Sequence, residues 1–303
     1  MVKSDANLFR KIINARYSYL FLAPFFIVFI LFILIPAILA IVYSFTSFDM
    51  LQKPVFNGFT NYIQVIVKDG LFITSFKNTL FIALITGPVG YVLAYLFAYL
   101  INLIADRYRA LFVVLFYIPS MLSGVAMAVV WKVFFASDSY GYLNSFLLNA
   151  GLINEPLYWL NDPDLILPII VLISLWMSLG AGFLSFLAGF QLVNREELEA
   201  GRVDGITSRA QELWYIILPS MKPQLLFGAI LAVVGSFRVG DVGSALVGFP
   251  APNDVGLTLV LHMRDYAYTR YELGYACTIA VILFVMVFAA SRWCFSVLGS
   301  KDD

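Results

Sequence analysis

The sequence predicts an all-α membrane protein that crosses the bilayer six times. Three observations predict this fold class: 61% of the 303 residues are hydrophobic, only 13% are charged, and the hydrophobic residues gather in about six long runs. A helix of about 20 apolar residues spans the hydrocarbon core and satisfies its own backbone hydrogen bonds. Because this composition lies well outside the averages of soluble domains, most of the chain must meet lipid.

The predicted spans can be placed from the hydrophobic runs. The first, Tyr19–Tyr43, follows a cationic leader that could be taken for part of a signal peptide. Its apolar run is too long for that, and no small-residue cleavage site ends it. The other five spans are expected at Phe72–Ile104, Ala110–Phe135, Leu165–Phe190, Leu225–Val247 and Leu273–Leu298.

Lysine and arginine predict which side of the membrane each connection faces, because positively charged loops stay in the cytoplasm. Cations concentrate in the amino-terminal leader, after the second and fourth spans, and in the carboxyl-terminal tail. The connections 48–70, 137–164 and 249–272 then face outward, and the middle one carries no lysine or arginine. Both termini are therefore expected in the cytoplasm, with residues 1–18 as a cytoplasmic amino-terminal segment.

Several classes of protein are excluded by the residues that the chain contains. Cys277 and Cys294 lie in one apolar run, roughly 25 Å apart along a helix, so they cannot form a disulfide with each other. His262 is the only histidine, which excludes a histidine-based metal cluster. No basic tail points to nucleic acid, and no phosphate-binding loop of the form G-x-x-x-x-G-K-[ST] occurs. The chain is therefore expected to bind no cofactor and no metal itself.

The longest charged stretch, residues 194–219, predicts a helix, a sharp turn and a second helix. Asn194 and Ser208 are each followed three residues later by Glu or Gln, which is typical of a capped helix start. Between the two helices, Asp204-Gly205 is a turn dipeptide whose glycine can adopt a positive φ. A polar helical hairpin between two membrane spans is a plausible docking element for a soluble partner.

This stretch resembles the EAA signature of ABC import permeases, in which Glu-Ala-Ala, three residues, Gly and about nine residues precede Ile-x-Leu-Pro. Gly201 replaces the second alanine here, and ten residues separate Gly205 from Ile216. The absence of bulk at Ala200 and Gly201 would let the surface of another protein approach the first helix closely. The resemblance implies that residues of about 191–224 form a cytoplasmic coupling loop seated in a groove of a separate ATPase subunit. The residues expected to act in this loop are Glu197, Glu199, Ala200, Gly201, Asp204, Gly205, Leu218 and Pro219.

The likeness extends from the first span to the last, and the whole chain is similar to sugar-importing permeases of the maltose type. The type I importer permease fold follows from this resemblance, with residues 19–303 as the transmembrane permease domain. The implied partners are a second, homologous permease, an ATPase dimer that binds ATP and magnesium, and an extracytoplasmic solute-binding protein. The phrases that carry the likeness include Tyr19-Leu-Phe-Leu-Ala-Pro24, Phe59-Thr-Asn-Tyr62, Lys77-Asn-Thr-Leu80, Pro119-Ser120 and Trp159-Leu-Asn-Asp-Pro163.

The same resemblance implies a substrate pathway along the fourth and fifth spans. Arg238 and Asp241 are three residues apart on one predicted helical face, so they either form an ion pair between themselves or contact the solute. Arg238 leaves acidic sugars open, because a guanidinium can hold a carboxylate through two hydrogen bonds. The expected pathway residues are Ser174, Trp176, Met177, Ser178, Ser236, Arg238, Val239, Gly240, Asp241 and Gly243.

Other conspicuous residues are interpreted as structural. Leu143, Phe146 and Leu147 recur at helical spacing before Gly151, which suggests a short amphipathic helix at the outer interface that packs as a lid. A further four polar residues in or near the spans are interpreted as interfacial anchors or helix-packing groups rather than ligands. These four are Asn78, Trp131, Lys132 and His262.

We therefore expect a permease subunit that catalyses no covalent chemistry and imports a sugar, in the first instance an oligosaccharide, by alternating access. A glycerophosphodiester or a polyol is the alternative cargo. An ion-coupled secondary transporter would need acidic or histidine relays and broken helices in the membrane, for which Asp241 is nearly the only candidate. An intramembrane hydrolase would need a paired nucleophile and base or facing carboxylates within the spans, and neither is visible.

Overall fold

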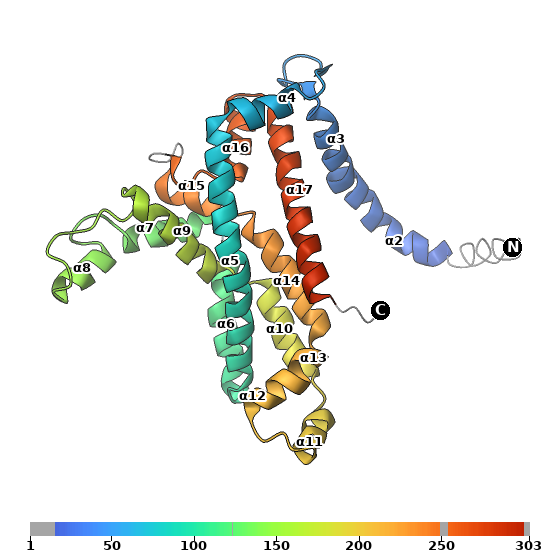
Figure 1. Cartoon of the computed structure of the whole chain (residues 1–303), viewed down its shortest axis with the longest axis vertical. Coiled ribbons are helices and arrows are strands. Elements are labelled where there is room, and N and C mark those ends of the chain that lie inside the picture. The colour runs from blue at the N-terminus through green and yellow to red at the C-terminus, as the bar shows by residue number, and fades with distance from the viewer. Residues whose placement is uncertain (1–15, 123, 249–253, 300–303) are drawn as a thin grey trace, which may run out of the picture.

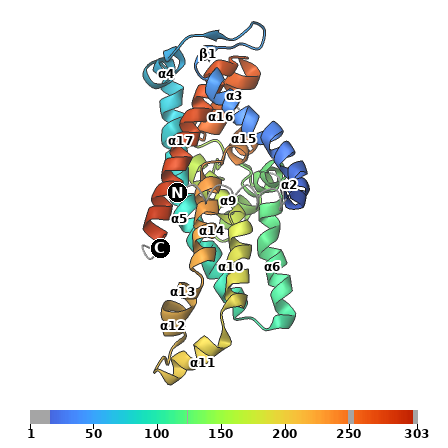
Figure 2. The same cartoon turned by 90° about the vertical axis from the view of Figure 1, so that its right-hand side faces the viewer.

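The computed structural model (Figures 1 and 2) describes residues 16–122, 124–248 and 254–299, and it is helical almost throughout. Among these residues, five helices are long and apolar enough to cross a membrane, and a bent pair makes a sixth crossing if it is counted as one span. The residues of the leader before Arg16 and of the tail after Gly299 lie outside the described residues. The polytopic all-α fold expected from the hydrophobic runs is confirmed.

The first span stands apart from the rest of the chain. It slopes away from the body in Figure 1 and has no buried residue along its apolar window. Its last part, α3, packs against α17, while large side chains such as Phe21 and Phe32 remain exposed. The span consists of α2 (Arg16–Phe29), a π-helical turn at Ile30–Leu34 and α3 (Ile35–Tyr43).

The second span, α5 (Gly70–Asn102), is the central post of the molecule. Its 33 residues give a length of roughly 50 Å, against about 30 Å for the hydrocarbon core. The helix starts where the Asp69 carboxylate accepts a hydrogen bond from the Phe72 amide, 3.0 Å away. Thr86, Gly90, Ala94 and Ala98, spaced four apart and buried, allow close approach of α10 and α14, which both pack on α5.

The third, fourth and fifth predicted spans are each interrupted in the middle. The third span, expected over Ala110–Phe135, is bent, because its two helices meet at an angle of 100°. The turn lets the second helix pack on α15, where the Gly124 backbone lies so close to Asp241 that an added Cβ would be 3.1 Å from the Asp241 Cβ. The three pairs are α6 (Asp106–Met121) with α7 (Gly124–Phe134), α9 (Pro163–Met177) with α10 (Ala181–Leu192), and α14 (Lys222–Ser236) with α15 (Asp241–Val247).

One end of the molecule carries the charged hairpin and the turn between α5 and α6, as both views show (Figures 1 and 2). The hairpin consists of α11 (Arg195–Val203), α12 (Arg209–Glu212), a π-helical turn at Leu213–Ile217 and α13 (Leu218–Ser220).

The predicted short helix in the connection after α7 is confirmed as α8 (Tyr142–Asn149), followed by Gly151 with a φ of +68°.

The opposite end is a small packed unit, which we call the cap and define as residues 44–69 and 254–276. Its core contains the buried side chains of Val65, Leu259 and Tyr275 together with Phe72 of α5 and Ile279 of α17. A two-stranded antiparallel hairpin closes it, with Thr46 opposite Phe56. The elements of the cap are β1 (Thr46–Ser47), β2 (Val55–Phe56), α4 (Thr60–Ile63), π-turns at Gln64–Lys68 and Asp265–Thr269, α16 (Leu259–Arg264) and the start of α17 (Leu273–Leu298).

Candidate functional site

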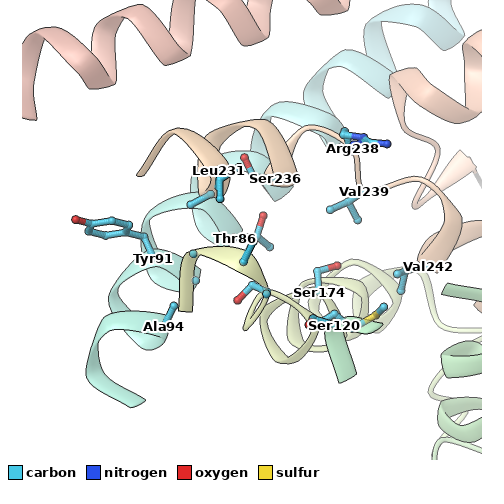
Figure 3. A pocket seen from close by; sticks show the side chains of 18 of the residues that line it. Thr86, Tyr91, Ala94, Ser120, Ser174, Leu231, Ser236, Arg238, Val239 and Val242 are labelled. Atoms are coloured by element: carbon cyan, nitrogen blue, oxygen red, sulfur yellow. The ribbon is translucent and has the colours of Figure 1, made fainter. Parts of the chain in front are cut away.

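A cavity of about 550 Å³ lies where the three interrupted spans meet α5, and Figure 3 shows side chains that line it. This volume is within the range of small-molecule sites, roughly 300–1,000 Å³. Tyr91 and Ala94 lie at one end of the cavity, and Arg238 and Val242 lie at the other. Each interrupted span contributes residues at or next to its interruption, so the cavity is built from the breaks themselves.

The breaks replace regular helical hydrogen bonds of the backbone beside the cavity. In the fourth span, the Ser178 amide donates to Leu175 O at 3.1 Å and the Gly180 amide donates to Ser178 O at 2.8 Å, in place of regular helical bonds. In the fifth span, the Arg238 amide donates to Gly235 O at 3.1 Å. Non-helical backbone at membrane depth is tolerated only when it is buried in protein or lines a water-filled space. The convergence of these breaks on one cavity identifies a polar space within the spans.

Five serine and threonine hydroxyls line the cavity, and all five use their proton within their own helix. Each donates to a backbone carbonyl three or four residues earlier, at 2.6 to 2.8 Å. A hydroxyl that donates in this way still has acceptor lone pairs available. The cavity is therefore rich in acceptors for a ligand that brings its own O–H or N–H donors. The five residues are Thr86, Ser120, Ser174, Ser178 and Ser236.

The two charged residues of the lining do not pair with each other, so the first of the two alternatives given for Arg238 and Asp241, a mutual ion pair, is not the one formed. Both alternatives assumed a continuous helix, whereas residues 237–240 are not helical. Asp241 instead forms its ion pair with Arg264 of α16. Arg238 is exposed and forms no ion pair with any residue that the structure describes.

The structure brings most of the predicted pathway residues together. Two of the ten do not line the cavity: Trp176 packs edge-to-face on Trp131, with ring centroids 5.2 Å apart, and Gly243 is buried against Ile170 and the Gly256 carbonyl. The other eight line it, namely Ser174, Met177, Ser178, Ser236, Arg238, Val239, Gly240 and Asp241.

Sequence reasoning missed the contribution of α5. A row of small residues spaced four apart along the second span was the available signal, because such a row lets other backbones approach. The third span also contributes through the residues on either side of its bend. The lining residues not anticipated on these two spans are Thr86, Gly90, Tyr91, Ala94, Ser120 and Gly124.

The four residues interpreted as structural all lie outside the cavity lining. Asn78 donates to the carbonyls of Asp254 and Leu257, and His262 is 1% exposed and bonded to Asp69. Trp131 packs into the core around α9, and Lys132 is exposed on α7. The packing role predicted for Asn78 and His262 is thus visible in their contacts.

The charged hairpin has the local structure that its sequence predicts. The Ser208 hydroxyl accepts from the Gln211 amide at 3.2 Å, and the Gln211 carboxamide accepts from the Ser208 amide, which completes a capping box. Asn194 caps the first helix through the amide of Glu196. Gly205 has a φ of +98°, as the predicted turn requires, and an added Cβ there would meet nothing within 4 Å.

The smallness of Gly201 serves the hairpin itself, which corrects our interpretation of it as an opening for another protein. Gly201 is buried, and an added Cβ would overlap Ile216. Glu199, Ala200, Asp204 and Gly205 face solvent around it, and Pro219 is exposed while Leu218 is half-buried. Glu197 accepts a hydrogen bond from Ser220 at 3.1 Å, which joins the first helix to the end of the second.

An apolar surface accompanies these polar residues at the hairpin end. Val203, Trp214 and Tyr215 are 87%, 68% and 67% exposed. Arg202 and Glu212 form an ion pair beside them, with 2.8 Å between Nε and Oε1. Large exposed apolar side chains are typical of a protein-binding surface.

Comparison with known proteins places this geometry in a family. Residues 87–292 match the family model described as binding-protein-dependent transport system inner membrane component. The probable ABC transporter permease protein YesP of Bacillus subtilis is 31% identical over 272 residues, covering 89% of this chain and 86% of the relative. The arabinooligosaccharides permease AraP of the same species is 29% identical, covering 93% and 88%, and the lactose permease LacF of Rhizobium radiobacter is 29% identical, covering 89% and 90%.

A chain in the crystal structure of a bacterial ABC transporter that imports the acidic polysaccharide alginate has the same fold, with a TM-score of 0.77 at 22% identity. The match covers 98% of this chain and all of that one. The broken helices of this fold therefore do not distinguish an ion-coupled secondary transporter from an ABC importer permease. The chain belongs to the family of inner-membrane components of binding-protein-dependent transport systems, and it is an ABC transporter permease subunit rather than an enzyme.

Proposed function

We propose that this permease imports a sugar, in the first instance an oligosaccharide, through the cavity at the helix breaks. The observation that carries the proposal is the set of five cavity hydroxyls that retain only acceptor capacity. A sugar presents many O–H donors, so it matches such a lining. The relatives named for arabinooligosaccharides and lactose support a carbohydrate cargo.

A second, homologous permease is the partner that we propose for the first span. The first span has 27 residues from Tyr17 to Tyr43, and its most apolar 18-residue window has a mean hydropathy of 3.3 and no buried residue. The cavity is also open on the side of Arg238 and Gly235, both of which are exposed. A second permease against this side would enclose the cavity and complete the pathway.

An ATPase dimer is the partner that we propose for the hairpin end. The exposed Val203, Trp214 and Tyr215 offer an apolar contact, and the exposed Glu199 and Ala200 lie next to them in the hairpin. ATP and magnesium would be bound by that partner, and this chain would transmit its movement to the interrupted spans through α13 and α14. The coupling residues proposed are those of the loop of about 191–224.

Orientation follows from this assignment. The hairpin end would face the cytoplasm together with both termini and residues 1–18, and residues 19–303 would form the permease domain. The cap would then face outward, where an extracytoplasmic solute-binding protein delivers the cargo. A related structure, that of the alginate transporter in complex with its pentasaccharide-bound periplasmic protein, supports a binding protein as a partner.

The test is to reconstitute this chain with its second permease, ATPase and binding protein in liposomes and to measure ATP hydrolysis. Neutral and acidic oligosaccharides, a polyol and a glycerophosphodiester are added in turn. We expect a saccharide to stimulate hydrolysis, and stimulation by the polyol or the phosphodiester alone would overturn the sugar assignment.

Two matched variants test the coupling loop in the same assay. Gly205→Trp places a bulky side chain at a positive-φ turn of the hairpin, and Gly151→Trp does the same at a positive-φ turn after α8; an added Cβ meets nothing within 4 Å at either position. We expect Gly205→Trp to assemble in the membrane yet to lose sugar-stimulated hydrolysis, because the bulk blocks the ATPase surface. Equal behaviour of the two variants would overturn the coupling assignment.

A further inference from the structure

The cavity has an unbalanced positive charge at the end that carries Arg238. Among the described residues that line it, the only charged ones are Arg238 and Asp241. Asp241 already holds an ion pair with Arg264, whose guanidinium reaches it from α16. Two guanidinium groups and one carboxylate therefore gather there, and the guanidinium of Arg238 is the one without a carboxylate partner among the described residues.

The position of Arg238 makes this surplus informative. The residue lies in the non-helical segment between α14 and α15, inside a span of 26 residues. An arginine within a span is costly, and such residues face a water-filled space or a binding partner. Figure 3 shows Arg238 at the edge of the cavity, beside Val239 and at the far end from Tyr91.

We propose that the cargo is an acidic sugar whose carboxylate is bound by Arg238, a proposal that rests on the proposed sugar import. A planar guanidinium can donate two parallel hydrogen bonds to a carboxylate, which an ammonium cannot match in geometry. The cavity hydroxyls accept hydrogen bonds from the remaining sugar hydroxyls. The ion pair of Arg264 prevents Asp241 from neutralising Arg238 or repelling the cargo.

The proposal assigns a division of roles within the cavity. Thr86, Ser174 and Ser236 recognise any polyhydroxylated ligand, because their acceptor capacity does not depend on charge. Arg238 distinguishes acidic from neutral cargo of the same shape. Substituting a cavity hydroxyl should therefore lower transport of acidic and neutral sugars alike, whereas substituting Arg238 should lower transport of acidic sugars more.

The experiment uses the complete importer in liposomes and matched probes. Oligomers of galacturonate, glucuronate and mannuronate are compared with their neutral methyl esters, which keep length and linkage but remove the charge. Sugar-stimulated ATP hydrolysis and uptake are measured for wild type, Arg238→Gln and Arg238→Lys, and binding of each probe to the isolated binding protein is titrated separately. Lys132→Gln is the matched control, because it removes an exposed cation from a span at a position that does not line the cavity.

We expect at least one acidic oligomer to stimulate wild type, Arg238→Gln to lower its uptake by about tenfold or more, and Arg238→Lys to retain part of it. The loss of uptake in Arg238→Gln should be larger for the acidic oligomer than for its neutral ester, and Lys132→Gln should match wild type for both probes. Stimulation of wild type by neutral sugars alone would overturn the acidic cargo and leave sugar import standing. An equal loss for acidic and neutral probes in Arg238→Gln would assign Arg238 to contact with the second permease, whereas no stimulation by any saccharide would overturn the proposed function itself.

Discussion

The cap and the cavity use polar side chains in opposite ways. In the cap, Asp69 accepts hydrogen bonds from His262 Nε2 at 2.7 Å and from the Tyr275 hydroxyl at 2.8 Å, and His262 and Tyr275 are at most 7% exposed. In the cavity, Arg238 is exposed and forms no ion pair within the described residues, and the hydroxyls use only their donors. The Asp69 carboxylate of the cap is bonded within the fold, with Nδ1 of His262 left without a partner, whereas the cavity groups are left with free capacity.

Whether a polar residue of a membrane protein is bonded within the fold therefore indicates whether its role is structural or functional. A buried polar group that is bonded within the fold contributes to stability, and removing its partner leaves an expensive unpaired group. A polar group left without a partner at a cavity does not stabilise the fold, and it gains its hydrogen bonds only when a ligand binds. Substitutions in the cap should therefore affect folding, and substitutions in the cavity should affect transport.

The largest effect on folding is expected from Gly274→Ala in the cap. An added Cβ would overlap the Thr46 carbonyl, and the Gly274 amide donates to Phe48 O at 2.9 Å, so the backbone cannot retreat easily. The expected cost is about 3 kcal/mol, measured as a lower unfolding temperature in detergent or nanodiscs. Gly235→Ala is the matched substitution at the cavity, where an added Cβ meets nothing within 4 Å, and it should leave the unfolding temperature unchanged.

A smaller effect, with a distinctive pH dependence, is expected from Asp69→Asn. Burial acts to raise the pKa of the Asp69 carboxyl, but hydrogen bonds from His262, Tyr275 and the Phe72 amide outweigh it and hold the pKa below its ordinary value of 3.8. Because the folded-state pKa is lowered, the stabilisation is present above 3.8 and is lost as pH falls through the lower folded value. The variant should lose about 2 kcal/mol at neutral pH.

The measurement for Asp69 is the unfolding temperature between pH 7 and pH 3. Wild type should lose more stability than Asp69→Asn in the most acidic part of this range, because the variant has no charge there to lose. Asp106→Asn is the control, since Asp106 is 89% exposed in its pair with Arg109. Parallel curves for wild type and Asp69→Asn would show that the cap cluster does not stabilise the fold through its charge.

A still smaller effect is expected from single hydroxyls. Thr278 is fully buried and lies 3.0 Å from the Ser44 carbonyl, which ties α17 to the cap. Thr278→Val should cost about 1 kcal/mol. Ser174→Ala removes a cavity hydroxyl that bonds only within its own helix, and its cost in unfolding should be near zero. A greater destabilisation by Ser174→Ala than by Thr278→Val would contradict the comparison.

The smallest effect on folding, with the clearest effect on transport, is expected from Gly235→Leu. The position lines the cavity and has room for a side chain. The added bulk should lower sugar uptake by about tenfold or more, while the unfolding temperature and the amount of assembled complex stay at wild-type values. Normal uptake by a normally assembled variant would show that the cargo does not pass this side of the cavity.

The sequence predicted the spans well because burial in lipid imposes a long, continuous apolar run that local composition reveals. It predicted the capping box at Ser208 and the turn at Gly205 because these are interactions between near neighbours. Only tertiary contacts reveal the role of Gly201, whose neighbour Ile216 lies fifteen positions later in the chain.

The interruptions of three spans could not be predicted in the same way. A break of a few residues disappears in a hydropathy window, and Ser and Gly also occur in continuous membrane helices. Arg238 and Asp241 were expected on one helical face for this reason, and the non-helical segment from Phe237 to Gly240 separated them. Trp176 packs on Trp131 and lies outside the cavity lining, a contact between two spans that the sequence of its own span does not encode.

The length of α5 has a mechanical consequence. It runs unbroken from Asp69 in the cap to Asn102 near the hairpin end, while three of the spans around it are interrupted. Pro88 lies within this helix and removes one of its backbone hydrogen bonds. A straight rod of roughly 50 Å that pivots by about 10° about one end displaces the other by roughly 9 Å. A small rotation of α5 at one face of the membrane would therefore produce a large displacement at the other face, so this helix can couple movements of the cap to movements of the hairpin end.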